Sequence, residues 1–266
     1  MGSNSVPGVE QLMLFAQDTL KRCGETALDY HRQVKPHERF DEELVTRTEV
    51  HLTTLFQEHL KRTFPAHRMF GADLQTEGYT HDQTRYMWIF DPIDGVDNFQ
   101  ARIPVWSMSL ALMENYWPIF GLILMPATGD MFHAKAGGQA YHGAEPIVLP
   151  IGDSGEDEGL IFTFSRFHKH YQTNYPGKIR NLGCTAAHLG YLAMGRADAA
   201  VVANESFKDL AAAAVIVEAA GGKIFKMTGE PFYASDYLDG QKISDHLIIT
   251  KPDRLEALLS FLKPAA

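Results

Sequence analysis

The sequence predicts a layered α/β sandwich. Three observations carry this prediction: helical periodicity before residue 63, apolar strand-like runs from residue 86 onward, and a second half in which both patterns alternate. Helices and strands that mix in this way bury their apolar faces by packing as layers. With 266 residues, the chain is long enough to bury a substantial core. We expect two closely joined halves, residues 6–150 and 151–266, that together form one compact unit.

Two amphipathic helices are expected at the start of the chain. Apolar side chains recur at three- and four-residue steps from Val9 to Cys23, which is the period of a helix with one buried face. A second helix is predicted over residues 43–62, with Leu52 and Phe56 on its buried side. It ends before Pro65, because proline cannot continue a helix.

Strands are expected in the middle of the chain. Residues 86–90 form an apolar run, and further strands are predicted over 105–112 and 119–124. A shorter strand over 131–134 leads into the turn at Gly137-Gly138.

The second half begins with a predicted hinge at residues 151–158, which are polar, acidic and glycine-containing. Beyond it we expect strands over 160–164, 199–203, 224–225 and 247–249, and helices over 185–194, 210–219 and 254–262. Gly221-Gly222 follows the alanine-rich helix 210–219, as a glycine signal at a helix C-terminus does.

Composition excludes several classes of protein. The formal charge of −9 argues against a nucleic-acid partner, whose binding surface is usually basic. The chain has two cysteines and no CxxC pair, so we expect neither a disulfide framework nor a thiolate zinc site. No apolar run approaches the length of a membrane span and no signal-peptide core is evident, so the expected compartment is the cytoplasm.

The segment from Asp91 to Gly95 is the first candidate site. It places two carboxylates three residues apart around a proline, directly after an apolar run. Hard divalent cations such as Mg²⁺ prefer oxygen ligands. A strand that delivers two carboxylates into a turn is therefore a candidate for metal-assisted phosphoryl chemistry. The same residue types are common in solvated turns, which is the alternative interpretation of this spacing.

Asp209 and Thr185 mark a second candidate site. Asp209 stands at the start of the alanine-rich helix, where an aspartate can cap the helix or ligate a metal. Thr185 lies at the start of another helix, whose free N–H groups can hold an anion. A plain loop-to-helix junction is the alternative in both places.

Taken together, these motifs resemble the inositol monophosphatase family, part of the lithium-sensitive, Mg²⁺-dependent sugar phosphatases. Residues 88–99 resemble its first signature, W-x-x-D-P-[IL]-D-G-T-x-N-F, and residues 208–222 resemble its second, W-D-x-A-A…E-A-G-G. The match runs in order from about residue 11 to residue 262. The resemblance implies an αβαβα sandwich of the inositol monophosphatase/fructose-1,6-bisphosphatase type, and it implies a homodimer.

The resemblance also implies roles for individual residues. Asp91, Asp94 and Asp209, with the carbonyl of Ile93, would hold Mg²⁺, with Mn²⁺ as an alternative metal. The backbone N–H groups of Gly95 and of the residue after it, Val96, would receive the phosphate of a small phosphorylated metabolite.

Three departures from the family pattern fall on the side of the site that activates water. Ala72 stands where the family has a metal-ligating glutamate, with Asp73 beside it as a substitute acid. Val96 replaces the threonine whose hydroxyl holds the attacking water, and Glu49 replaces the aspartate that partners this hydroxyl. The loss of a positioned base or water holder costs on the order of 10²–10⁴ in rate.

The substrate-recognition positions differ as well. The acid that contacts inositol hydroxyls in the family corresponds to Val202, so Glu205 is the nearest acid, and Lys208 replaces a tryptophan. We therefore expect a phosphomonoesterase with impaired or altered catalysis on a substrate other than inositol 1-phosphate. The alternatives are an inactive pseudophosphatase that binds a ligand or partner, and new chemistry in the old cleft.

Overall fold

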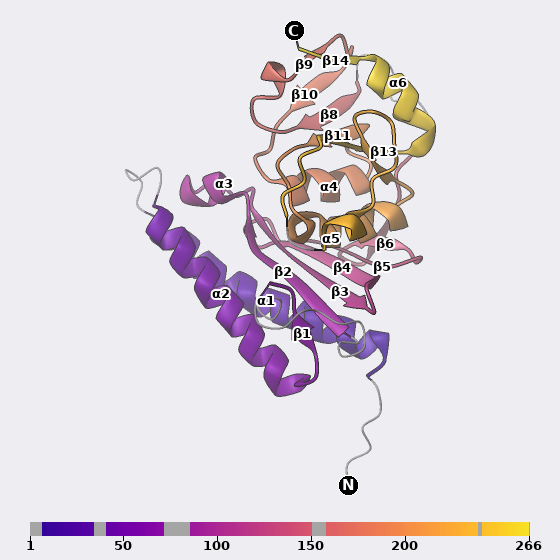
Figure 1. Ribbon diagram of the computed structural model, residues 1–266. Coiled ribbons are helices and arrows are strands. Elements are labelled where there is room, and N and C mark those ends of the chain that lie inside the picture. Colours follow the sequence, from indigo (N-terminus) through magenta and orange to yellow (C-terminus); the bar gives the residue numbers. More distant parts are fainter. Residues whose placement is uncertain (1–6, 35–40, 72–85, 151–157, 239–240, 266) are drawn as a thin grey trace.

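The computed structural model describes residues 7–34, 41–71, 86–150, 158–238 and 241–265. In it the chain forms alternating layers of helices and sheets (Figure 1). A long helix pair comes first, followed by a seven-stranded sheet, a second helix pair, a five-stranded sheet and a short outer helix. The predicted αβαβα sandwich is confirmed.

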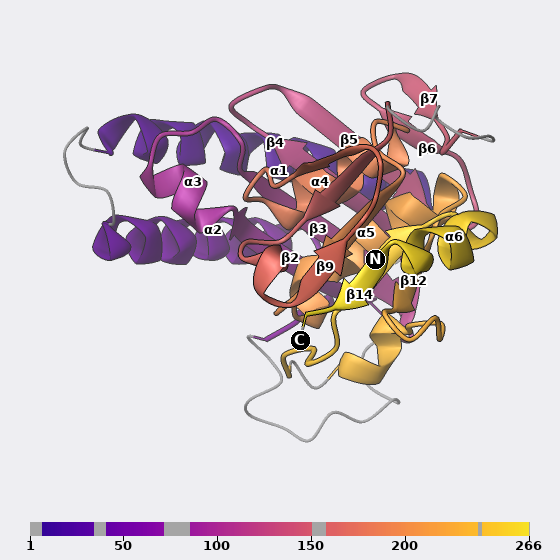
Figure 2. The same ribbon diagram turned by 90° about the horizontal axis from the view of Figure 1, so that it is seen from above.

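The first layer is an antiparallel pair of helices, α1 (Val9–Gln33) and α2 (Glu42–Thr63). Asp41 caps α2, because its side chain accepts a hydrogen bond of 2.8 Å from the N–H of Leu44. Seen from above, the short helix α3 (Val96–Gln100) lies beside the end of this pair (Figure 2). The ring of Phe99 in α3 contacts the ring of His31 at the end of α1, with centroids 5.2 Å apart.

The first sheet follows chain order. Its strands are β1 (Arg68–Met69), β2 (Tyr86–Asp94), β3 (Ser107–Glu114), β4 (Trp117–Met125), β5 (Asp130–Lys135), β6 (Ala140–His142) and β7 (Glu145–Ile147). All neighbours pair antiparallel except β1 and β2. Alternation along β2 serves two cores: Trp88 and Phe90 pack with α1 and α2, whereas Met87 and Ile89 face the second helix pair.

The second sheet has the order β10-β8-β11-β13-β12. Its strands are β8 (Leu160–Thr163), β10 (Lys178–Arg180), β11 (Ala199–Val202), β12 (Lys223–Lys226) and β13 (Leu247–Thr250). Helices α4 (Thr185–Ala193) and α5 (Phe207–Ala219) lie between the two sheets, and α6 (Leu255–Ser260) covers the outer face. Strands β9 (Tyr171–Thr173) and β14 (Leu262–Pro264) form a ribbon, and η1 (Phe167–Lys169), η2 (Ala234–Tyr237) and η3 (Pro252–Arg254) are 3₁₀ turns.

Helix α5 is rich in alanine because it must pack closely on both sides. A Cβ atom at Gly121 of β4 would lie 2.3 Å from the carbonyl oxygen of Ala212. This distance means that sheet and helix touch backbone to backbone, which larger side chains would prevent. The alanine-rich sequence therefore sets the spacing between the first sheet and the helix that carries Asp209.

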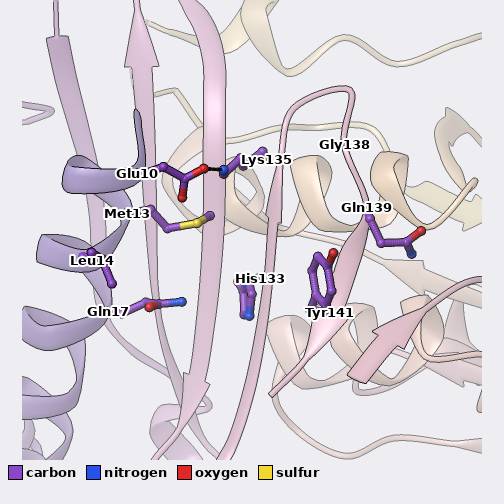
Figure 3. A pocket seen from close by; sticks show the side chains of 9 residues that line it. All are labelled: Glu10, Met13, Leu14, Gln17, His133, Lys135, Gly138, Gln139 and Tyr141. Atoms are coloured by element: carbon purple, nitrogen blue, oxygen red, sulfur yellow. Dashed lines mark hydrogen bonds and ion pairs between the residues drawn. The ribbon is translucent and has the colours of Figure 1, made fainter. Parts of the chain in front are cut away.

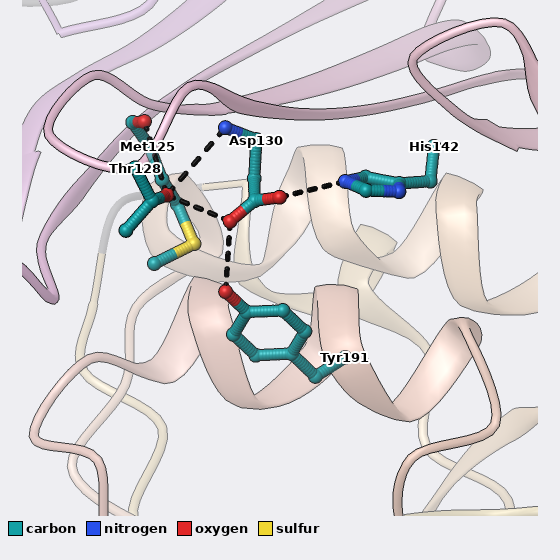
Figure 4. Close-up of polar contacts among 5 residues, drawn as sticks. All are labelled: Met125, Thr128, Asp130, His142 and Tyr191. Atoms are coloured by element: carbon teal, nitrogen blue, oxygen red, sulfur yellow. Dashed lines mark hydrogen bonds and ion pairs between the residues drawn. The ribbon is translucent and has the colours of Figure 1, made fainter.

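A polar cluster ties the turn between β4 and β5 to α4 (Figure 4). The carboxylate of Asp130 accepts hydrogen bonds from Thr128 at 2.7 Å and Tyr191 at 2.8 Å, and it lies 2.7 Å from the ring of His142. Burial raises the pKa of Asp130, but these hydrogen bonds outweigh it and the net shift is downward. The cluster thus favours a charged carboxylate that joins the first sheet to the second half.

Most predicted elements are confirmed, with shifted ends. The terminal helix is wrong in its extent, since α6 ends at Ser260 and the chain then pairs as β14 with β9. The strands β6, β7, β9, β10 and β14 were not predicted, because three residues are too few to show an alternating pattern. Residues 151–157 of the predicted hinge lie outside the described residues.

Candidate phosphate and metal site

Strand β2 carries Asp91 and Asp94, the first two aspartates of the candidate site, toward the helix layer formed by α4 and α5. Asp91 is buried, and the pairing of β2 with β3 shifts its register between Asp91 and Asp94, where proline interrupts the ladder. Gly95 then adopts φ 85°, in the left-handed region. A Cβ at Gly95 would lie 3.0–3.1 Å from Cys184 and from two backbone carbonyls, so the turn requires glycine.

Helix α4 meets Asp94 with its N-terminus. The Oδ2 atom of Asp94 accepts a hydrogen bond of 2.6 Å from the N–H of Ala186, and the thiol of Cys184 donates to the same atom at 3.3 Å. Burial raises the pKa of Asp94, and these hydrogen bonds oppose the rise. The predicted anion-binding N-terminus is therefore directed at a carboxylate of the chain itself.

Asp209 lies inside α5, not before it. The helix begins at Phe207, and Ser206 is its N-cap. The carboxylate of Asp209 accepts hydrogen bonds from the N–H of Ser206 at 2.7 Å and from its hydroxyl at 2.9 Å, which forms a capping box. The N-cap position proposed for Asp209 is thus wrong by three residues, because Ser206 caps the helix and Asp209 serves as the N3 residue of the capping box.

Lys208 reaches from α5 across to β2. Its Nζ lies 2.9 Å from Oδ1 of Asp91, and its side chain is 38% exposed against 5% for the aspartate. Burial raises the pKa of Asp91 to about 7, Lys208 opposes this rise, and the nearby carboxylates of Asp94 and Asp209 add to it. Burial also raises the pKa of Glu49 on α2, again against the pull of Lys208. Burial is thus the main cause of both pKa shifts, and Lys208 opposes it at both carboxylates.

Glu205 and Thr185 form the other side of the site. Their side chains share a hydrogen bond of 2.8 Å. Burial raises the pKa of Glu205 to about 8, and the charge of Asp94 adds to this rise. Val202, by contrast, is buried in β11 and faces the core between the sheets. It has no route to a substrate.

The donor chemistry of the cluster suits Mg²⁺, since carboxylates and carbonyls are its preferred ligands. Ile93 buries its side chain in the first core, so only its backbone carbonyl could serve as a ligand. Yet the carboxylates of Asp91, Asp94 and Asp209 all pair with donors of the chain itself. Within the described ranges, no three His, Cys, Asp or Glu side chains are grouped as a metal's ligand set.

The remaining residues that the sequence predicted for the site are Gly95, Val96, Ala72 and Asp73. Gly95 is the N-cap of α3 and Val96 is its first residue, and Val96 packs against the first core. Ala72 and Asp73 lie outside the described residues. The metal, phosphate and catalytic roles themselves stay predictions.

Sequence reasoning missed three features of the site. The buried side chain of Asn98 donates to the carbonyls of Val105 at 2.6 Å and Leu182 at 2.7 Å, and so joins the two halves. Cys184 supports Asp94, and Lys208 pairs with Asp91. The sequence did contain one indication of the role of Lys208: it is a charged residue directly beside Asp209, at the start of an otherwise apolar helix.

A separate surface hollow lies between α1 and the strands β5 and β6 (Figure 3). Glu10 and Lys135 form an ion pair at its rim, and Met13, His133 and Tyr141 line it. None of the predicted site residues belongs to its lining.

The five-layered α/β sandwich is the fold that the motifs predicted. The sequence profile of the inositol monophosphatase family matches residues 9–250. The chain therefore belongs to the inositol monophosphatase family.

The individual relatives that the chain resembles are phosphatases with several different names. The chain is 26% identical to a fructose-1,6-bisphosphatase/inositol-1-monophosphatase of Aquifex aeolicus, over 73% of this chain and 75% of the relative. It is 27% identical to a histidinol-phosphatase of Chlorobaculum parvum, over 80% of this chain and 85% of that protein. The solved Thermotoga maritima IMPase matches with a TM-score of 0.73 at 22% identity, covering 93% of this chain and 95% of that one. At this identity, the structural match shows the fold alone. In the described part of the chain, no helix is long and apolar enough to cross a membrane.

Proposed function

We propose that the protein is a Mg²⁺-dependent phosphomonoesterase with altered catalysis, which acts on a small phosphorylated metabolite. The observation that carries the proposal is that the carboxylates of Asp91, Asp94 and Asp209 lie close enough for their charges to interact, where α4 and α5 begin. Glu49 and Glu205 lie at the margins of this cluster. Raised pKa values of buried carboxylates in such a cluster are typical of functional sites.

Each residue has a role in this proposal. Asp91, Asp94, Asp209 and the Ile93 carbonyl would hold Mg²⁺ or Mn²⁺. When bound, such a metal neutralises phosphate charge and lowers the pKa of a bound water. The chain's own contribution is to hold the phosphate on the N–H groups of Gly95 and the next residue, and to keep Glu49 close to the cluster.

Val96 and Ala72 weaken the side of the site that prepares water. Val96 has no hydroxyl to hold water or pass on its proton, so Glu49 has lost its partner. Asp73 is the acid we propose as a substitute. We expect turnover on the order of 10²–10⁴ below that of a site with both groups in place.

The substrate follows from the polar groups that remain. Thr185 and Glu205 lie beside Asp94 and would contact the alcohol portion of the ester. The names of the relatives cover sugar bisphosphate, inositol phosphate and histidinol phosphate, so the class is a small polyol or amino-alcohol phosphate. With Val202 buried, we do not expect inositol 1-phosphate to be preferred.

The assembly we propose is a cytoplasmic homodimer, as the resemblance implies. An apolar hollow of ≈ 540 Å³ beside the exposed Trp117 supports it, since Tyr116, Phe232 and Tyr233 also line this hollow. Light scattering at two concentrations tests the assembly.

Phosphate release from a panel of small sugar, polyol and amino-alcohol phosphates tests the activity. The wild type is measured with Mg²⁺ or Mn²⁺ against Asp94→Asn as the matched blank. Release above this blank supports a phosphatase, and the preferred compound names its class. Equal silence of both proteins across the panel contradicts the proposal.

The ion pair between Lys208 and Asp91 favours a second candidate, a pseudophosphatase that binds a ligand or partner without turnover. The combined substitution of Ala72→Glu with Val96→Thr distinguishes the two. Turnover gained only by this variant supports a decayed phosphatase, whereas turnover already present in the wild type rejects it.

A further inference from the structure

Lys208 places a positive charge inside the carboxylate cluster. It is the second residue of α5, and its side chain crosses to β2, where Nζ lies 2.9 Å from Oδ1 of the buried Asp91. The pair therefore links two elements that belong to different halves of the chain. The phosphatase proposed above gives this lysine no role of its own.

The surroundings of Lys208 are acidic on several sides. Besides Asp91, its ammonium interacts electrostatically with Asp209 in its own helix and with Glu49 on α2. Asp94 lies close enough to Asp91 for their charges to interact. One lysine thus serves as countercharge to carboxylates from three elements. This is the electrostatic task that a divalent cation would perform at the same oxygens.

We propose that the Lys208 ammonium is a tethered cation that competes with divalent metal for Asp91, so that a metal enters the cluster only when this side chain moves away. The ammonium occupies one lone pair of Oδ1 and places its positive charge close to where a metal ligated by Asp91 would lie. Mg²⁺ requires near-ideal octahedral geometry at its ligands, and an ammonium held beside Asp91 repels it. The movement itself is open to Lys208, because its flexible side chain is 38% exposed.

The proposal assigns Lys208 a control of metal affinity, and it rests on the metal site of the proposed function. Removal of the charge frees Asp91 and removes the repulsion. We therefore expect Lys208→Met to bind Mn²⁺ at least about tenfold more tightly than the wild type. Lys208→Arg retains the charge and should stay within about threefold of the wild type.

Mn²⁺ binding is measured without substrate, by electron paramagnetic resonance of free Mn²⁺ and by calorimetry. Lys178→Met, an exposed lysine in the short strand β10, is the matched control for loss of one positive charge. Asp91→Asn combined with Lys208→Met reports whether the gained affinity passes through Asp91. Thermal unfolding of each variant shows that the proteins compared are folded.

A tenfold gain for Lys208→Met that is absent from Lys178→Met and abolished by Asp91→Asn supports the proposal. Equal or weaker Mn²⁺ binding by folded Lys208→Met, or a gain that survives Asp91→Asn, overturns it. Failure of the proposed function is a separate result: Lys208→Met would then bind Mn²⁺ tightly, and phosphate release would remain at the level of the blank.

Discussion

Asn98 is the residue whose loss should loosen the site without touching its carboxylates. Its Nδ2 donates to the carbonyls of Val105 and Leu182, and its side chain is 8% exposed. Asn98→Ala leaves both acceptors without this donor. A buried acceptor that loses its partner costs about 1–3 kcal/mol, and because both carbonyl residues are only partly buried, we take the low end for each. The expected loss is therefore about 2–3 kcal/mol in the free energy of unfolding.

Asn98→Asp tests the same argument more severely. The shape is kept, but a carboxylate cannot donate, and its charge would face two carbonyl oxygens. We expect it to cost more than the alanine variant at pH 7 and to recover partly as the pH falls and the carboxyl becomes a donor. Equal stabilities of the two variants at every pH would contradict this.

Urea unfolding followed by circular dichroism gives the free energies. Asn174→Ala is the matched control, because Asn174 is exposed and its backbone hydrogen bond to Phe261 survives the change. It should stay within about 0.5 kcal/mol of the wild type. A loss below about 1 kcal/mol for Asn98→Ala would refute the view that this side chain joins the two halves.

Three further perturbations test the packing and the buried charges. Gly121→Ala would place a Cβ 2.3 Å from the Ala212 carbonyl, and we expect a loss of about 3 kcal/mol, because backbone cannot yield as a side chain can. Burial lowers the pKa of His188 to about 4, so folding disfavours its protonation, and stability should fall by about 2 kcal/mol between pH 7 and pH 5. The variant His188→Gln, which does not titrate, should show a shallower decline. Arg254→Met removes the ion pair that Arg254 makes with the buried carboxylate of Asp198 and should cost about 3 kcal/mol.

Each of these has its own contradicting result in urea unfolding. Ala212→Gly should not rescue Gly121→Ala, since the atoms that clash are backbone, and a rescue would show that the side chain was the obstacle. If the free energy of unfolding falls equally with pH in wild type and His188→Gln, other groups cause the acid sensitivity. The double variant Asp198→Asn with Arg254→Met should recover part of the stability lost in Arg254→Met. If the losses of the two single variants simply add, Asp198 and Arg254 do not stabilise each other.

The fold was predictable because its layers follow from periodicity. The apolar run of β2 and the three- and four-residue steps in α1 are properties of neighbouring residues, so they are visible in the sequence. The three-residue strands are defined by their pairing partners, which for β9 and β14 lie far apart along the chain, and each strand is too short to show a pattern of its own. Asp91 and Asp94 could be predicted as site residues for the same reason as the layers, because they are close neighbours in the sequence on either side of a proline.

The partners of those aspartates were not predictable. Lys208 stands next to Asp209 in the sequence, yet it pairs with Asp91, which lies on another element. Asp94 takes its hydrogen bonds from Ala186, 92 residues away. Such contacts depend on how two helices sit on the first sheet, and that arrangement is a property of the whole core.

Two departures from the family pattern have a common electrostatic meaning. The change to Ala72 removes one negative charge from the set that the resemblance implies, and the change to Lys208 adds one positive charge. Both changes act in the same direction, because each lowers the negative charge that bound cations would have to balance at the proposed metal site. Lys208 provides part of that compensation directly on Asp91. We therefore interpret the changes to Ala72 and Lys208 as one coordinated change in how the cluster balances its charge. Two independent losses would not need to act in the same direction. This is why the metal affinity of Lys208→Met, more than the turnover of the wild type, reveals what the altered cluster does.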